Sequence, residues 1–311
     1  MKRLTTASFV AFAALVFSGA VHAITYGQLD GNKHPYVGEL LLYAPAEIDS
    51  RFTDPGGWFS CSGTLISSTV VVTAGHCVAG VGNGGAVTSD CSATGANCGN
   101  DMWINFSNAP DFSAFPASSG YIPDNNAQRY IDRAAYLNDP ANGWVHATAY
   151  VHPQFADGSF LLHDVGVIVL STPVEMGQYG LLPELGALDA YFAKRRNAQR
   201  FTPVGYGLNK VLPIAEDGGD VREYASVMMV SLNALGLPAG TSVVFSNNNG
   251  ASHQGGTCFG DSGGPVFVGD SNQMVAVTSF GLSPNCTGFD GAYRIDQQDD
   301  LDFIGQFLPQ P

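Results

Sequence analysis

A serine surrounded by glycines is the first residue in the sequence whose context suggests catalysis. Ser262 lies in the run Gly256-Thr257-Cys258-Phe259-Gly260-Asp261-Ser262-Gly263-Gly264-Pro265. Glycines beside a reactive side chain allow backbone turns that a Cβ would forbid, and they let a substrate approach closely. A serine hydroxyl is a weak nucleophile at neutral pH, so it needs a neighbouring base to take its proton. That base must come from elsewhere in the chain.

The position of the histidines decides where the base comes from. The segment Gly260-Asp261-Ser262-Gly263-Gly264 alone also fits the Gly-x-Ser-x-Gly turn of α/β-hydrolases. In those enzymes the acid and then the histidine follow the serine. The last histidine here is His253, so none follows Ser262. The base is therefore expected upstream of the serine.

Two upstream segments carry a histidine and an acid in suitable surroundings. Thr73-Ala74-Gly75-His76-Cys77 follows a β-branched run, and His163-Asp164-Val165-Gly166 opens another apolar run. The order His76, Asp164, Ser262 is that of a known His–Asp–Ser triad. His163 is adjacent to Asp164, but its neighbours mark the entrance of a strand. We therefore expect His163 to be structural, and His152 likewise.

The elements that must position these residues are short apolar runs separated by turn residues, a pattern that favours β-structure. The strands expected near the candidate residues are 64–66, 69–73, 165–170, 265–268 and 274–280. A short helix is expected within 183–194, and a C-terminal helix within 296–308, with Asp296 as its N-cap. The stretches 82–140 and 208–256 are rich in loop-forming residues. These patterns predict an all-β fold with a C-terminal helix.

The first 23 residues have the layout of a secretory signal peptide. Lys2 and Arg3 precede an apolar run at 9–17, which is too short to span a bilayer. Small residues then lead to Val21-His22-Ala23, so cleavage is expected after Ala23, with a competing site three residues earlier. The protein is therefore expected to be secreted, extracellular or periplasmic, and not a membrane protein.

Export changes the interpretation of the six cysteines. Oxidising compartments favour disulfides, and the absence of any Cys-x-x-Cys pair argues against a metal site. Six cysteines allow fifteen pairings. Cys91 and Cys98 are seven residues apart in a polar loop and form the natural local pair, while Cys61 is placed to tether the histidine loop.

The charge balance limits the possible partners. The chain of 311 residues has 13 Lys+Arg and 27 Asp+Glu, a net charge of −14, and nucleic acid is therefore an improbable partner. The acidic stretch Glu216-Asp217-Gly218-Gly219-Asp220 lacks the ligand spacing of a known calcium loop, so a solvated turn is expected there. No cofactor and no metal are expected.

With these motifs in place, the chain resembles the chymotrypsin/trypsin-like serine proteases, especially their secreted bacterial branch. The resemblance rests on Thr-Ala-Gly-His-Cys, His-Asp-Val-Gly and Gly-Asp-Ser-Gly-Gly-Pro. Shorter matches occur in family order at His152-Pro153, Val204-Gly205-Tyr206-Gly207, Ser279-Phe280-Gly281 and Gly291-Ala292-Tyr293. The resemblance implies a protease domain over 24–311 with two six-stranded β-barrels, at about 24–180 and 200–295, and a helix at about 296–308.

The resemblance also implies a role for each candidate residue. Ser262 would attack the peptide carbonyl, His76 would act as base, and Asp164 would orient His76, while the N–H groups of Gly260 and Ser262 would form the oxyanion hole. The disulfides implied are Cys61–Cys77, Cys258–Cys286 and, by what remains, Cys91–Cys98. A new N-terminus at Ile24 would insert beside Asp261, and signal removal alone would expose it, without a separate propeptide.

The family pattern places the specificity pocket around six residues: Gly256, Thr257, Ser279, Phe280, Gly281 and Gly291. Gly256 stands at the pocket floor, where trypsin has an acid, so a neutral or apolar residue is favoured at the first substrate position (P1) over Lys or Arg. Asp290 complicates this expectation, because a small shift of the loop after Cys286 would bring its carboxylate to the pocket.

The expected protein is a monomeric serine endopeptidase that acts on proteins or peptides. Two other functions remain open from the sequence. A binding protein on the same fold would have lost catalysis, although inactive relatives commonly lose one of the residues that are intact here. An esterase would use the same triad on a simpler substrate.

Overall fold

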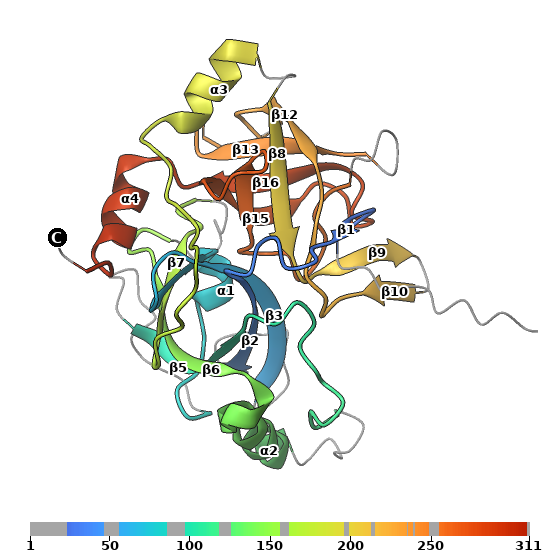
Figure 1. Cartoon of the computed structure of the whole chain (residues 1–311), viewed down its shortest axis with the longest axis vertical. Helices are drawn as coiled ribbons and strands as arrows, with labels where there is room; N and C mark the ends of the chain where they lie inside the picture. Colours follow the sequence, from blue (N-terminus) through green and yellow to red (C-terminus); the bar gives the residue numbers. More distant parts are fainter. Residues whose placement is uncertain are drawn as a thin grey trace, which may run out of the picture.

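The structure is a computed structural model that describes residues 24–46, 56–85, 97–117, 126–155, 162–195, 199–212, 215–234, 236–238, 240–248 and 255–309. Its strands form two closed six-stranded antiparallel barrels, one above the other in Figure 1. The expected signal peptide lies outside the described residues. No helix among those described is long and apolar enough to cross a membrane.

The first barrel is closed in the strand order β2-β3-β4-β7-β6-β5. Its strands are β2 (Val37–Pro45), β3 (Gly56–Leu65), β4 (Val70–Thr73), β5 (Asn97–Asn105), β6 (Val145–Val151) and β7 (Gly166–Leu170). The apolar runs of β2 and β4 are buried along their whole length. β6 instead alternates between buried and partly exposed residues, as expected of a strand with one face on the core.

The second barrel is closed in the order β8-β12-β13-β16-β15-β14, with β14 pairing back onto β8. Its strands are β8 (Arg200–Gly205), β12 (Val227–Ser231), β13 (Ser242–Asn247), β14 (Pro265–Val268), β15 (Met274–Gly281) and β16 (Gly288–Arg294). Two short strands extend this sheet, β1 (Gln28–Leu29) and β11 (Glu223–Tyr224), and a separate hairpin is formed by β9 (Leu208–Leu212) and β10 (Ala215–Gly218).

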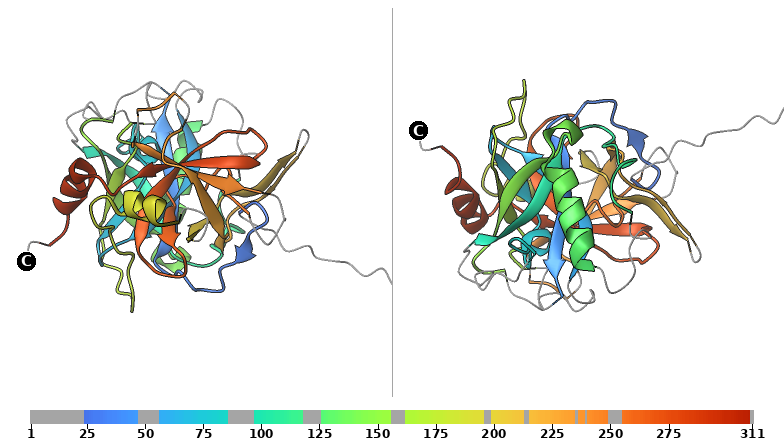
Figure 2. Two further views of the ribbon diagram at one scale, coloured as in Figure 1. Left: turned by 90° about the horizontal axis from the view of Figure 1, so that it is seen from above. Right: turned by 90° about the horizontal axis from the view of Figure 1, so that it is seen from below.

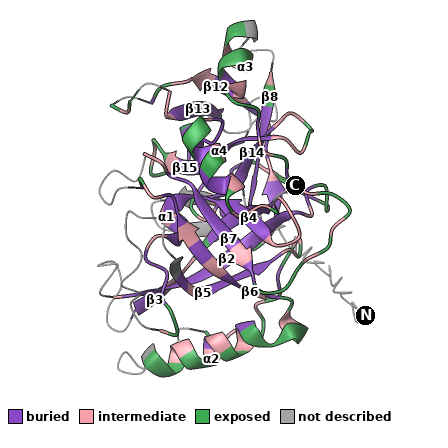
Figure 3. Ribbon diagram, turned by 90° about the vertical axis from the view of Figure 1, so that its left-hand side faces the viewer, coloured by how far each residue is buried: buried purple, intermediate pink, exposed green. Residues whose placement is uncertain are grey.

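The helices lie outside the barrels (Figure 2). They are the single turn α1 (Gly75–Val78), α2 (Asn126–Asn138), α3 (Ala187–Arg195) and α4 (Gln298–Gly305), with a 3₁₀ turn at Pro140–Asn142. The buried strands occupy the centre of the molecule in Figure 3, while α2 lies at its edge and combines exposed, intermediate and buried residues. Leu137 of α2 packs with Leu41, Trp103 and Trp144 in a small aromatic core of its own.

The fold class expected from the sequence is confirmed. The strands expected beside the candidate residues are present as β3, β4, β7, β14 and β15; β3 begins eight residues earlier than expected, and the other ends agree within one residue. Two expectations were wrong. The stretches expected to be loop-rich contain regular elements, β5 and α2 within 82–140 and β9 to β13 within 208–256, and Asp296 does not cap α4. The Asp296 carboxylate instead accepts hydrogen bonds from Arg294 and from the Leu188 amide, so Gln297 takes the N-cap position.

Candidate active site

The serine loop is a glycine-dependent turn of the second barrel that docks on the first. Gly260 and Gly263 have φ angles of +97° and +76°, a region that favours glycine. A Cβ on Gly263 would lie 2.0 Å from Thr73 Oγ1, so only glycine fits against β4. The Ser62 amide of β3 donates to the Ser262 carbonyl at 2.8 Å. The nucleophile candidate is therefore fixed at the seam between the two barrels.

His76 is held on the opposite side of this seam by one helical turn and a disulfide. It lies in α1, whose next residue, Cys77, is bonded to Cys61 of β3. The buried Asp164 carboxylate accepts from the His76 amide at 2.8 Å and from its Nδ1 at 2.9 Å. Because a carboxylate can only accept, Nδ1 carries a proton. In the neutral imidazole, Nε2 is then left with its lone pair.

Asp164 has a further donor that the sequence did not reveal. Ser279 Oγ donates to Asp164 Oδ2 at 2.5 Å. Ser279 was expected to contact substrate, and it does line the cavity beside Ser262. It therefore has two contacts, one with the cavity and one with the acid behind His76.

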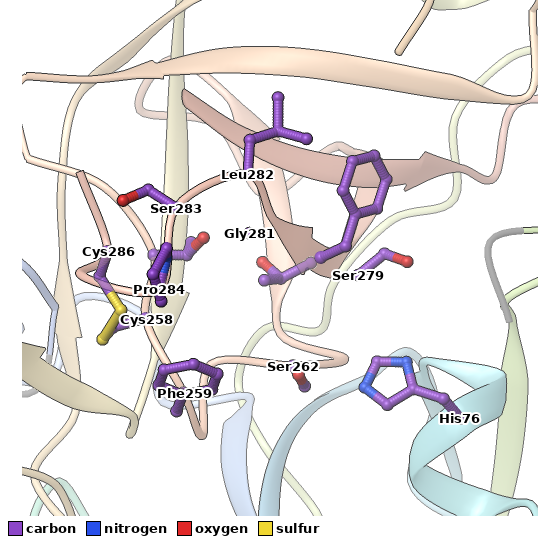
Figure 4. Close-up of a pocket in the computed structure, with 13 residues that line it drawn as sticks. His76, Cys258, Phe259, Ser262, Ser279, Gly281, Leu282, Ser283, Pro284 and Cys286 are labelled. Atoms are coloured by element: carbon purple, nitrogen blue, oxygen red, sulfur yellow. A yellow bond between two sulfur atoms is a disulfide. The ribbon is translucent and has the colours of Figure 1, made fainter. Parts of the chain in front are cut away.

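His76 and Ser262 line one cavity of about 500 Å³. Figure 4 shows Ser262 between His76 on one side and Phe259 on the other. Within the described part of the chain, the backbone N–H groups of Gly260 and Ser262 donate to no other residue. Two unused donors beside a serine hydroxyl can stabilise an oxyanion that forms there.

The walls of this cavity are neutral apart from His76. They include Thr257, Ser279, Phe280 and Gly281, as expected, together with Leu282, Pro284 and the Cys258–Cys286 disulfide. Phe259 and Leu282 are more than half exposed at the rim. An apolar or neutral side chain suits this lining better than a cation does.

Two glycines expected to line the cavity are placed elsewhere. A Cβ on Gly291 would lie 2.1 Å from the ring of Phe280, so that ring covers the glycine. A Cβ on Gly256 would lie 2.1 Å from the Asn247 side chain, which occupies the space in front of it. The described lining of the cavity includes neither glycine. Sequence reasoning missed Asn247 because nothing near it in the chain signals a role at the site.

Asp290 lies behind the cavity, not in it. Its carboxylate accepts from Asn247 Nδ2 at 2.8 Å and from the Thr257 amide at 2.5 Å, and the residue is 4% exposed. Burial raises the pKa of Asp290, the hydrogen bonds from Asn247 and Thr257 offset part of this rise, and the resulting pKa is about 6. Asp290 borders a separate small cavity with Thr257 and Gly291. The complication that it posed for specificity is not realised in this geometry.

The other histidine pair packs against α4. The rings of His152 and His163 stack with centroids 4.8 Å apart, and His163 Nδ1 lies 3.2 Å from Asp299 Oδ2. His152 Nδ1 accepts from the Gln154 amide at 3.2 Å, so in the neutral ring Nε2 carries the proton. His163 is not part of the described cavity lining, in keeping with the structural role expected for it.

Two groups of described residues bring potential metal ligands within 4.8 Å of one another. One is Cys61, His76 and Cys77, whose sulfur atoms are joined in the disulfide. The other is the His152 and His163 pair with Asp299 and Asp300. In this second group the proton on His152 Nε2 opposes binding of a cation there.

The residues expected to meet at the N-terminal pocket, Ile24 and Asp261, have other hydrogen-bond partners. The Ile24 main-chain nitrogen donates to Glu223 Oε2 at 3.0 Å. The Asp261 carboxylate accepts from the amides of Gly207 and Cys258, each at 2.8 Å. The sequence did not point to Glu223, which lies in a stretch interpreted as loop-rich. The expected Cys91–Cys98 disulfide lies outside the described residues.

Comparisons with known proteins agree with the fold. The profile of the family named Trypsin matches residues 133–298, more than half of the chain. Asp164 and Ser262 fall within this match, and His76 precedes it. Phenoloxidase-activating factor 1 of Holotrichia diomphalia is 25% identical over 244 residues, which cover 76% of this chain and 58% of that protein. The chain thus spans less than two thirds of that relative's length.

Solved structures show the same fold at low sequence identity. HL collagenase superposes with a TM-score of 0.56 at 18% identity, covering 92% of this chain and 96% of that one. HBP superposes with a TM-score of 0.56 at 16% identity, covering 93% and 98%. The secreted bacterial branch that the motifs resembled stays a prediction, since the curated relative is from a beetle. The family match and the two-barrel fold together show that the chain belongs to the trypsin family of serine proteases.

Proposed function

We propose that the protein is a secreted serine endopeptidase that uses His76, Asp164 and Ser262 and forms an acyl-enzyme intermediate. The proposal rests mainly on one observation. The His76 ring donates to the buried Asp164 at 2.9 Å and shares a cavity with Ser262. That arrangement gives a serine hydroxyl an oriented base, which is what a serine nucleophile needs.

The geometry supports a two-step acyl transfer. His76 Nε2 takes the proton of Ser262 Oγ while Oγ bonds to the carbonyl carbon of the substrate, and the N–H groups of Gly260 and Ser262 stabilise the resulting oxyanion. The imidazolium, stabilised by Asp164, then gives its proton to the leaving amine as the peptide bond breaks. Water next attacks the acyl-enzyme with His76 again as base, and the new carboxylic acid leaves Ser262 free.

The cavity lining supports a neutral or apolar P1 residue. Phe280, Leu282 and Pro284 contribute apolar surface, and no carboxylate is part of the described lining. Asp290 is separated from the cavity, and both of its oxygens already accept hydrogen bonds. A Lys or Arg side chain would therefore find no anion to offset the loss of its hydration.

The end of β15 offers an edge to which a substrate strand can pair. Phe280 and Gly281 pair with β16 on one side, while β14 stops pairing with β15 at Val277. A peptide lying along Ser279–Gly281 would add as an antiparallel strand, which is a recurrent mode of peptide recognition. Such pairing would present the scissile carbonyl to Ser262.

Two features support secretion. The sequence has the layout of a signal peptide before Ile24, and the structure contains two disulfides, Cys61–Cys77 and Cys258–Cys286. Disulfides persist mainly in oxidising compartments.

Fluorophosphonate labelling together with hydrolysis assays tests the proposal. Wild-type protein and Ser262→Ala would be labelled and then assayed on casein and on a simple ester. We expect labelling and casein hydrolysis by the wild type, and neither by Ser262→Ala, with the loss of kcat near 10⁶-fold seen when such a nucleophile is removed from a related site. Ser283→Ala, a change on the same cavity wall, is the control and should still be labelled.

The alternatives predict different results in the same assays. Labelling and ester hydrolysis without cleavage of casein would favour an esterase. Wild-type protein that is folded but neither labelled nor active would favour a binding protein. A chromogenic peptide panel extends the test to P1, and faster cleavage after Arg or Lys than after Phe or Leu would contradict the apolar preference.

A further inference from the structure

Asn247 is a buried side chain that connects Asp290 to the wall of the cavity of Ser262. It is the last residue of β13 and is 0% exposed. Its Nδ2 atom donates to Asp290 Oδ1 at 2.8 Å and to the Thr257 carbonyl oxygen at 3.2 Å. A carboxylate and a carbonyl can only accept, so the nitrogen of the Asn247 amide must face them. These two partners therefore fix the orientation of the side chain.

The oxygen of the same amide shows that Asn247 does more than fill space. Among the described residues, none donates a hydrogen bond to Asn247 Oδ1, which is buried. A buried polar atom without a partner destabilises the fold, and an apolar side chain of similar shape would avoid that cost. The asparagine is therefore explained by its donors, which hold Asp290 and Thr257.

Asp290 lies directly behind the wall of the cavity of Ser262. Thr257 lines this cavity, and its main-chain amide donates to Asp290 Oδ2 at 2.5 Å. Gly281 also lines the cavity, and it is paired with Asp290 across strands β15 and β16. Asp290 thus adjoins two residues of the cavity wall, although it is itself only 4% exposed.

Two side chains fill the space over the glycines of this wall. Asn247 packs on Gly256, where a Cβ would lie 2.1 Å from Asn247 Cγ. The Phe280 ring packs on Gly291, where a Cβ would lie 2.1 Å from the ring. The room that each glycine leaves is therefore taken by a residue of the protein, and a P1 side chain cannot enter it.

The Asp290 carboxylate is held by neutral groups. The hydrogen bonds to it come from Asn247 and Thr257. Its pKa of about 6 makes it an anion at about pH 8. The charge of Asp290 also helps to raise the pKa of Asp261, so a second acid lies within electrostatic range. A buried anion with neutral partners attracts a cation strongly wherever the two can meet.

We propose that Asn247 is a positioning residue that determines P1 specificity, because it holds Asp290 behind the cavity wall where a P1 Lys or Arg cannot reach it. Loss of the Asn247 amide would free one oxygen of Asp290 and would open the space over Gly256. A P1 guanidinium or ammonium would then reach the carboxylate. This proposal deepens the peptidase function proposed above and rests on it for the identity of the ligand as a substrate side chain.

The first test measures binding without catalysis. Benzamidine is a cation, and benzamide is a neutral molecule of nearly the same shape. Isothermal titration calorimetry at about pH 8 gives the Kd of each for the folded protein. We expect the two Kd values to agree within about threefold in the wild type, and benzamidine to bind at least about tenfold more tightly than benzamide in Asn247→Ala.

Three further variants make this test specific. The double variant Asn247→Ala/Asp290→Asn keeps the enlarged space without the carboxylate, so the preference for benzamidine should disappear. Asn247→Ser shortens the side chain but keeps a hydroxyl, and it should give a smaller gain, which covers the case in which Asn247→Ala does not fold. Asn83→Ala removes an exposed asparagine that follows α1 and should bind both ligands as the wild type does.

The second test measures hydrolysis of peptide p-nitroanilides with Arg, citrulline or Leu at P1. Arginine and citrulline have similar shapes and differ in charge. In Asn247→Ala, kcat/KM for Arg relative to citrulline should rise at least about tenfold, mainly through a lower KM for Arg. A merely structural effect of the substitution would instead lower kcat/KM for all three substrates together.

The outcomes separate this proposal from the proposed function. A folded Asn247→Ala or Asn247→Ser protein without any gain for the cationic ligand would overturn the role of Asn247, as would a wild type that already prefers benzamidine. A gain that persists in the double variant would assign the negative charge to a group other than Asp290. Wild-type protein that is not labelled by fluorophosphonate would contradict the peptidase function instead, and the two Kd values would still decide whether Asn247 shields Asp290.

Discussion

Two buried aspartates lie behind the cavity of Ser262, Asp164 behind His76 and Asp290 behind Thr257, and their carboxylates hold different groups. Asp164 accepts from the His76 ring and amide and from Ser279 Oγ. Asp290 accepts from the amides of Asn247 and Thr257. Both residues are less than 5% exposed. Burial and hydrogen bonding are therefore alike in the two regions.

The difference lies in whether the partner can change its charge. His76 can become an imidazolium when it accepts a proton, and Asp164 is placed to stabilise that charge. The amides beside Asp290 stay neutral. They do not offset the cost of burying a negative charge as a cation would, and the pKa of Asp290 rises to about 6. We infer that Asp164 serves the reaction and Asp290 serves the architecture of the pocket wall.

The largest effect that would test this contrast is expected from Asp164→Asn. An amide at this position keeps the shape of the side chain but cannot stabilise the imidazolium or hold the correct tautomer of His76. We expect kcat to fall by about 10⁴-fold, the size of this change in related triads, with KM for a small ester little altered. Steady-state kinetics on a chromogenic ester measure it.

The matched control is the same change at the other carboxylate. Asp290→Asn should leave kcat within about threefold of wild type, because its carboxylate accepts hydrogen bonds from Asn247 and Thr257 and not from His76 or Ser262. Comparable losses of kcat in the two folded variants would remove the distinction between the two regions.

A smaller effect is expected from Ser279→Ala, which removes one donor from Asp164 and leaves His76 untouched. A hydrogen bond to a charged group contributes about 1.5–3 kcal/mol, so a fall in kcat of about 10- to 150-fold is expected at most. Ser279→Thr keeps a hydroxyl at this position and should recover most of the loss. Equal kcat values for the alanine and threonine variants would show that Ser279 acts only as part of the cavity wall.

The candidate catalytic residues could be proposed from the sequence because they lie in local motifs. His76, Asp164 and Ser262 each have neighbours whose types are tied to the turn or strand that presents them, such as the glycines at 260 and 263 with positive φ. Five of the barrel strands, β3, β4, β7, β14 and β15, followed from apolar runs with turn residues between them. Such signals depend on a few consecutive residues, so they can be recognised without knowledge of the tertiary structure.

Residues that act through contacts distant in sequence could not be predicted in the same way. Glu223 meets Ile24 across 199 positions and Ser279 meets Asp164 across 115, and nothing local marks either residue. The placement of the pocket glycines could not be predicted for the same reason. Phe280 covers Gly291 because the two residues are paired across the neighbouring strands β15 and β16. Helix α2 was not predicted because its sequence is polar and resembles that of a loop.

The smallest expected effect is on the stability of the protein and not on its activity. It comes from the titration of Asp290. The pKa of Asp290 is raised to about 6 in the folded chain, against an ordinary value of 3.8 that applies when the chain is unfolded. Between pH 4 and pH 6 the unfolded chain releases this proton more readily than the folded chain. The free energy of unfolding must therefore fall as pH rises through this window and then level off above it.

Replacing Asp290 with asparagine removes this titration, so the difference between the two proteins isolates it from every other ionisable group. From pH 4 to pH 7 the wild type should lose up to about 3 kcal/mol more stability than Asp290→Asn, as measured by urea unfolding at a series of pH values. The free energy of unfolding of Asp290→Asn should be lower than that of the wild type at pH 4, where the folded wild type holds the protonated acid. At pH 7 this difference in stability should be smaller. Parallel stability curves would mean that the Asp290 carboxylate is compensated in the folded protein, and that it resembles Asp164 more closely than its amide partners indicate.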